Sequence, residues 1–95
     1  MRIDFIDCPP YIEQKLQAKH GVIRPEAEQA LSSKPRIRFV EKGNTQGEDL
    51  YIALGRTSEG RYLSVFFVYK PDLKTAIIIS ARNMSKKERK AYGRK

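Results

Sequence analysis

Two apolar stretches in the second half of the chain, residues 62–69 and residues 76–79, constrain the fold more than any other feature. Both are rich in aromatic and β-branched residues, which favour strands and disfavour helices. Residues 62–69 are apolar at nearly every position, which predicts a central strand covered on both faces. Because only the turn-forming segment 71–74 separates the two stretches, we expect them to pair as antiparallel strands.

Two further strands are predicted just before this pair. Ile37 and Phe39 alternate with arginines, which is typical of a strand with a basic outer face. Residues 49–57 also alternate apolar side chains between two faces, and the polar segment 42–48 forms the loop before them. Residues 58–60 have the composition of a hairpin turn. Together these segments predict a four-stranded antiparallel meander.

The first third of the chain predicts a short strand and two helices. Residues 2–6 alternate polar and apolar side chains, as a half-buried strand does. Residues 11–20 form a helix with Ile12 and Leu16 on one face, and Gly21 ends it. A second helix opens at Pro25, with Ala27, Ala30 and Leu31 on one face, and residues 32–35 stop it.

A third helix is predicted at the C-terminal end of the chain. Ser85 and Glu88 have the spacing of a capping box, and the helix extends to about Tyr92 before Gly93. The order strand, two helices, four strands and helix predicts one small α+β domain over residues 1–95.

Charge is concentrated in the last fourteen residues. The formal net charge is +8, and residues 82–95 carry seven basic residues and one acid, so this segment alone contributes +6. Such a surface favours polyanions, with nucleic acid first, anionic membrane second and an acidic protein third. No apolar run approaches the roughly 20 residues of a membrane-spanning helix, and the first residues lack a signal-peptide pattern. We therefore expect a cytoplasmic protein.

Cysteine and histidine are too scarce for several kinds of site. Cys8 is the only cysteine, which excludes an internal disulfide, and Cys8 with His20 is too little for a zinc site. We therefore expect no metal and no cofactor, and a Cys8 thiol that is packed or incidental rather than a nucleophile paired with His20. The sequence also lacks the phosphate-binding, zinc-protease, redox and serine-hydrolase motifs.

Several side chains are candidates for chemistry on a phosphate. His20 is the only histidine, and an imidazole exchanges protons near neutral pH, although a helix-end histidine is the alternative interpretation. Arg56 and Arg82 follow strands, where a guanidinium fork suits a phosphate, unless each is solvated or ion-paired. Glu48 is a candidate base or a solvated loop carboxylate, and Tyr92 contacts RNA or packs its helix. The basic face for RNA comprises Lys86, Lys87, Arg89 and Lys90.

The ordered motifs resemble the BrnT family of type II toxin–antitoxin toxins. The matching segments are Lys19-His20-Gly21-Val22, Glu26-Ala27, Glu48, Leu54-Gly55-Arg56, Gly60-Arg61-Tyr62-Leu63, and Ile78-Ile79-Ser80-Ala81-Arg82 followed by Glu88-Arg89 and Tyr92. The resemblance covers nearly the whole chain. The sequence departs from the family in its first strand, where Phe5 stands in place of the usual tryptophan.

This resemblance implies a RelE-like fold, metal-independent RNA cleavage and a ribbon-helix-helix antitoxin similar to BrnA. It also implies that operator DNA is bound only through the toxin–antitoxin complex. Carried over by motif, the implied site residues are Lys19, His20, Arg56, Arg82 and Tyr92, and Glu48 is a lower-ranked candidate.

The resulting hypothesis is an RNA endonuclease. A ribose 2′-hydroxyl attacks the adjacent phosphate, and His20 or Glu48 takes or relays the proton. Arg56 and Arg82 stabilise the charge that builds on the phosphate. The alternative is a non-catalytic nucleic-acid-binding or partner-docking module, which explains the charge equally well.

Overall fold

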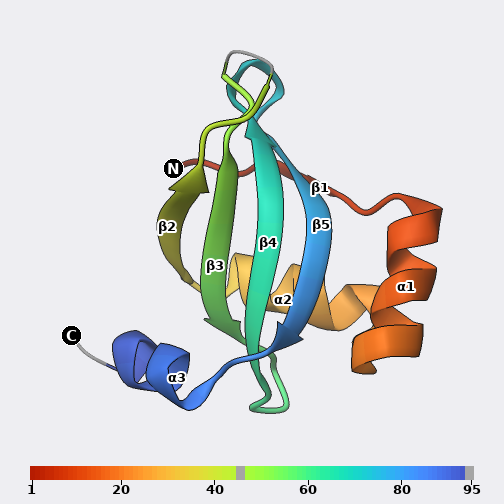
Figure 1. Cartoon of the computed structure of the whole chain (residues 1–95), viewed down its shortest axis with the longest axis vertical. Helices are drawn as coiled ribbons and strands as arrows, with labels where there is room; N and C mark the ends of the chain where they lie inside the picture. The colour runs from red at the N-terminus through yellow and green to blue at the C-terminus, as the bar shows by residue number, and fades with distance from the viewer. Residues whose placement is uncertain (45–46, 94–95) are drawn as a thin grey trace.

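The protein folds as a five-stranded sheet with two helices on one face and a third helix at one end (Figure 1). A computed structural model describes residues 1–44 and 47–93. Thr45 and Gln46 of the predicted loop, and Arg94 and Lys95 of the predicted basic segment, lie outside the described residues. The elements are β1 (Phe5–Asp7), α1 (Pro10–His20), α2 (Arg24–Ser32), β2 (Arg36–Glu41), β3 (Leu50–Arg56), β4 (Tyr62–Lys70), the 3₁₀ helix η1 (Pro71–Leu73), β5 (Thr75–Asn83) and α3 (Lys86–Gly93).

The strands lie in the order β1-β5-β4-β3-β2. Strands β2 to β5 form the predicted antiparallel meander, which confirms the α+β fold. The N-terminal strand was predicted without a partner. It pairs with β5 in parallel, with Phe5 opposite Thr75, and so extends the meander to five strands.

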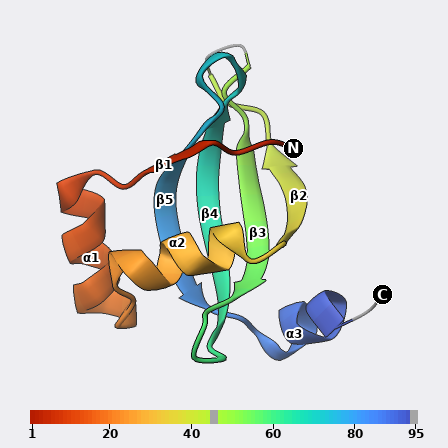
Figure 2. The same cartoon turned by 180° about the vertical axis from the view of Figure 1, so that it is seen from behind.

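The core lies between the sheet and helices α1 and α2. As predicted, Ile12 and Leu16 of α1 are buried, and so are Ala27, Ala30 and Leu31 of α2. They pack against the sheet side chains that point to this face. Figure 2, the view from behind, shows α2 crossing in front of the strands and α1 beyond the β5 edge. Cys8 is buried in the same core, which confirms the predicted packed thiol, and burial raises the pKa of that thiol.

The prediction that β4 is covered on both faces is wrong. Leu63, Val65, Phe67 and Tyr69 are buried on the face that the helices cover, whereas Phe66 and Val68, which point the other way, are only partly buried. Both long helices pack on the same face, so the apolar residues on the opposite face receive no helix over the middle of the sheet within the described residues. We call this second surface the open face.

Helix α3 lies at the end of the sheet where β3 and β5 finish (Figure 1). The predicted capping box starts this helix, because the Ser85 amide donates to Glu88 Oε1 at 2.8 Å and the Glu88 amide donates to Ser85 Oγ at 3.1 Å. No helix in the described ranges is long and apolar enough to cross a membrane.

Candidate functional site at the α3 end of the sheet

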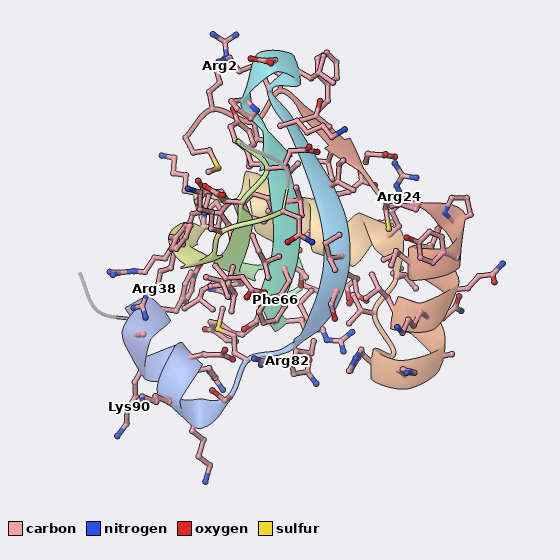
Figure 3. All side chains as sticks on the ribbon, turned by 45° about the horizontal axis from the view of Figure 1, so that its top comes forward. Arg2, Arg24, Arg38, Phe66, Arg82 and Lys90 are labelled. Atoms are coloured by element: carbon pink, nitrogen blue, oxygen red, sulfur yellow. The ribbon has the colours of Figure 1, made fainter. Side chains whose placement is uncertain are left out.

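The candidate site lies at the end of the sheet that α3 occupies, where Arg56 ends β3 and Arg82 lies near the end of β5. We call it the α3 end. Figure 3 shows Arg82 close to Phe66, Arg38 near α3, and Lys90 extending outward from α3. Within the described residues of α3, Lys86, Lys87, Arg89 and Lys90 are exposed, as the predicted basic face requires.

Arg82 forms a bidentate ion pair with Glu88. Arg82 Nη1 donates to Glu88 Oε1 at 2.7 Å, and Nη2 donates to Oε2 at 2.9 Å. Nη1 also donates to the Asn83 carbonyl oxygen at 3.2 Å. A guanidinium has five N–H groups, so Nε–H and one N–H of Nη2 are left to meet an anion. The fork is therefore fixed in direction and still has donors for a phosphate.

Glu88 has two further partners that fix it between the sheet and α3. Ser64 Oγ donates to Glu88 Oε1 at 2.9 Å, and the Ser85 amide donates to the same oxygen. These bonds, above all the one from Arg82, lower the pKa of Glu88 from 4.5 to about 2. The same ion pair raises the pKa of Arg82. Both groups are therefore charged across the range in which proteins usually work.

A second cluster forms around the ring of Tyr62, at the start of β4. The Arg89 guanidinium lies 4.1 Å from the ring centroid, and that of Arg56 lies 5.6 Å from it. Tyr92 meets the same ring edge-on at 5.9 Å. Cation–π contacts of this kind stabilise an arginine side chain in one position even where its guanidinium stays exposed to solvent. The structure thus brings together Arg56, Arg89 and Tyr92, which the sequence predicted as separate contributors.

A groove of about 330 Å³ runs between α3 and the sheet. It is lined by Arg38 of β2 and by Lys87, Glu88, Lys90 and Ala91 of α3. Among these lining residues the carboxylate of Glu88 already accepts hydrogen bonds from Arg82 and Ser64. The three cations therefore make the groove positively charged. The groove can therefore hold a phosphate of a polyanion.

Lys19 and His20 lie at the same end of the molecule, on the face that the helices cover. Arg61 connects them to β5: it donates to the backbone oxygens of Gly21 at 2.8 Å and His20 at 3.2 Å, and to Asn83 Oδ1 at 2.8 Å. Arg61 also pairs with Glu26 at 3.1 Å. The side chain of His20 is exposed, and no hydrogen bond links its imidazole to Arg82 among the described residues.

Glu48 lies at the opposite end of the sheet. It precedes β3, whereas Arg56 ends that strand, and its carboxylate pairs with Lys70 Nζ at 3.4 Å. Seven strand residues at about 3.3 Å each separate the two ends. The structure therefore does not bring Glu48 together with the arginines.

The sequence interpretation missed three residues of the α3 end. Glu88 was predicted as a helix cap and as part of the family motif, Arg38 was predicted on the basic outer face of its strand, and Ser64 was given no role. The buried Ser64 was the available signal, because a fully buried hydroxyl needs a partner, but nothing local identified that partner as Glu88.

The chain is similar to a known protein family. A family model described as "Ribonuclease toxin, BrnT, of type II toxin-antitoxin system" matches residues 12–88. No curated protein matches the chain. The matched range includes His20, Arg56, Arg82 and Glu88, and it ends before Lys90 and Tyr92. Because it spans most of the 95 residues, the chain belongs to the BrnT family of ribonuclease toxins of type II toxin–antitoxin systems.

Proposed function

We propose that this protein is an RNA endonuclease that cleaves without a metal ion and acts from the α3 end of the sheet. The observation that carries the proposal is the Arg82 fork, which Glu88 fixes at 2.7 and 2.9 Å beside a groove lined by Arg38, Lys87 and Lys90. Preorganised cations aimed at a phosphate supply the electrostatic stabilisation that phosphodiester cleavage needs most.

In the proposed reaction the ribose 2′-hydroxyl attacks the neighbouring phosphorus in line. The bond to the 5′-oxygen breaks, which leaves a 2′,3′-cyclic phosphate and a 5′-hydroxyl. Arg82, with Arg56 beside it, stabilises the charge that grows on the phosphate oxygens. Lys86, Lys87, Arg89 and Lys90 bind the flanking backbone, and Tyr92 packs the Tyr62 cluster that orients Arg56 and Arg89.

His20 is the proposed proton acceptor, with Lys19 next to it. An imidazole takes and returns a proton near neutral pH, and Arg61 keeps the His20 backbone next to the end of β5. Glu48 is a weaker candidate for this step, because it lies at the opposite end of β3 and pairs with Lys70.

The partner and cellular context follow from the family as proposals. We propose a RelE-like toxin fold and a cytoplasmic protein neutralised by a BrnA-like ribbon-helix-helix antitoxin. An antitoxin of complementary charge would cover the basic α3 end, and operator DNA would be bound only by the complex.

The first test is cleavage of a long single-stranded RNA by the purified protein in EDTA. We expect Arg82→Ala to slow cleavage by a factor of about 10² to 10³, the usual loss of one preorganised donor. His20→Ala is expected to slow it by about 10² to 10⁴ while RNA binding is retained. Arg2→Ala is the matched control, because Arg2 is an exposed arginine whose side chain, within the described residues, pairs with Asp4 of its own segment.

Two outcomes would contradict the proposal. Cleavage by Arg82→Ala at the parental rate would remove Arg82 from the site, and loss of parental cleavage in EDTA would make a metal necessary. If no variant cleaves and salt-sensitive binding persists, the protein is the alternative, a non-catalytic RNA-binding module.

A further inference from the structure

We propose that the open face of the sheet is a subsite for single-stranded RNA, on which one nucleobase stacks against Phe66 between two groups of cations. The inference rests on the proposed function, because it describes how the RNA that reaches the α3 end is held. It adds Phe66 as a base-stacking residue and assigns Arg38 of the groove to the RNA backbone next to that base.

The strand register places a row of four side chains across the open face. Arg38 of β2 lies opposite Ile52 of β3, Ile52 opposite Phe66 of β4, and Phe66 opposite Ser80 of β5. Residues directly opposite one another point to the same face of a sheet. Since neighbouring strands are about 4.8 Å apart, the Arg38 backbone is about 10 Å from that of Phe66.

Phe66 is an aromatic side chain in the middle of the sheet, and none of the helices in residues 1–44 and 47–93 covers it. It is only partly buried, and its neighbours on this face are apolar and also partly exposed: Leu50, Ile52, Val68 and Ile77. Apolar side chains of this kind usually face a core, and contiguous exposed ones commonly mark a binding surface. A central aromatic on an exposed sheet face is what RNA-binding sheets use to stack bases.

Cations lie on both sides of this ring. On the β5 side, the Arg82 guanidinium is 5.4 Å from the Phe66 ring centroid. On the β2 side, Arg38 is exposed and lines the groove with Lys87 and Lys90 of α3 (Figure 3). An aromatic platform with backbone-binding cations beside it is the arrangement by which proteins bind single strands.

The charges favour RNA as the occupant of this face. Glu88 is the one acid in the groove lining, and its oxygens already accept from Arg82, Ser64 and Ser85. The accessible charge around Phe66 is therefore positive, which complements a phosphate backbone on either side of a stacked base.

Binding of a fluorescent oligouridine with 2′-O-methyl groups at every position tests the inference, because this probe lacks the attacking hydroxyl and cannot be cleaved. We expect Phe66→Leu to weaken binding about 5- to 150-fold, the usual value of one stacked base. Phe66→Tyr keeps the ring and should bind like the parent. Phe39→Leu is the matched control, because Phe39 is 58% exposed but lies opposite Tyr51 on the other face.

Arg38→Ala should weaken the same probe and reduce the salt dependence of binding by about one phosphate contact, whereas Phe66→Leu should leave that dependence unchanged. Lys15→Ala, an exposed cation on α1, is the control for charge alone. Crosslinking of 5-bromouridine RNA to the unmodified protein is a second measurement, which does not depend on how the variants fold. We expect the crosslink on the β4 peptide that contains Phe66.

The outcomes separate this inference from the proposed catalysis. Parental binding by Phe66→Leu, or crosslinks confined to α1 and α2, would overturn the subsite even if the enzyme cleaves RNA in EDTA. Loss of binding in Phe66→Leu with no cleavage of ordinary RNA by the parent would support the subsite and overturn the catalysis.

Discussion

At the scale of single residues, Glu88 connects the sheet, the helix and the proposed chemistry. One carboxylate caps α3 through Ser85, binds the buried Ser64 hydroxyl and orients both Nη atoms of Arg82. Removing it would leave a buried hydroxyl without its acceptor and an arginine free to rotate. In the proposed reaction Glu88 is therefore a positioning residue, which would act on the phosphate only through Arg82.

The lowered pKa of Glu88 predicts a specific dependence of stability on pH. A carboxyl that titrates near 2 in the folded protein and near 4.5 when unfolded stabilises the fold fully above pH 4.5. This contribution is lost as the pH falls from 4.5 toward 2. We expect Glu88→Gln to cost about 2 kcal/mol at pH 7, less than the shift alone implies because Arg82 is partly exposed to solvent.

Urea denaturation of the parent and Glu88→Gln at pH 7, 4 and 3 measures this contribution. The difference in unfolding free energy between the two proteins should shrink as the pH falls. Glu13→Gln is the control, because Glu13 lies on α1, away from this network. A constant difference at all three pH values would show that Glu88 acts by packing rather than by charge.

Residue types in the sequence were enough to find the cations of the site but not their arrangement. Arg82 and the lysines of α3 were identified from strand ends and from a segregated charge. Phe66 was interpreted as core, because an unbroken apolar strand does not reveal that both long helices pack on one face. The environment of a side chain depends on the element that covers it, and that is a tertiary property.

At the scale of elements, the contact of α2 with β3 explains why a glycine precedes Arg56. A Cβ atom at Gly55 would lie 2.2 Å from the Ala30 carbonyl oxygen and 2.8 Å from its carbonyl carbon, both in the backbone of α2. The helix thus touches the strand directly. The Ser33 hydroxyl, which donates to the Ala30 oxygen, also accepts from the Arg56 amide at 3.3 Å, so this contact helps to place Arg56.

Gly55→Ala is therefore expected to destabilise the protein by about 3 kcal/mol, since backbone atoms cannot move aside as a side chain does. Gly93→Ala is the matched control, because its Cβ would meet nothing within 4 Å, and it should change stability by less than about 1 kcal/mol. Thermal denaturation followed by circular dichroism compares the two. Equal melting temperatures would contradict the proposed contact.

The local elements were predictable from the sequence, whereas one strand pairing was not. Hydrophobic periodicity, the Ser85–Glu88 spacing and the turn residues located the helices and the meander. The parallel pairing of β1 with β5 joins Phe5 to Thr75, far apart in the chain. Periodicity reports which face of a strand is buried but not which distant strand lies beside it.

At the scale of the whole molecule, the charge is distributed unevenly over a body of about 33 × 32 × 21 Å. Arg38, Arg82, Lys87 and Lys90 all belong to the α3 end and the adjoining open face, so four cations can meet one strand of RNA together.

Four such contacts predict a slope of about −3 for the logarithm of the association constant against the logarithm of the salt concentration. Raising the salt fourfold should then weaken binding of the 2′-O-methyl oligouridine about 50-fold. Fluorescence anisotropy at several salt concentrations measures this slope, with Lys15→Ala expected to leave it unchanged. A slope near zero would mean that phosphates contribute little and would contradict the electrostatic interpretation.

The parallel pairing of β1 with β5 also has a consequence during synthesis. At 5–20 residues per second, the ribosome makes the strand opposite Phe5 roughly 4 to 14 s after Phe5 itself. Until then the apolar faces of α1 and α2 have no complete sheet to pack on. The proposed site also needs Arg82 of β5 and the cations of α3, which are synthesised after the other elements of this domain, so the site is incomplete until these two elements have been made.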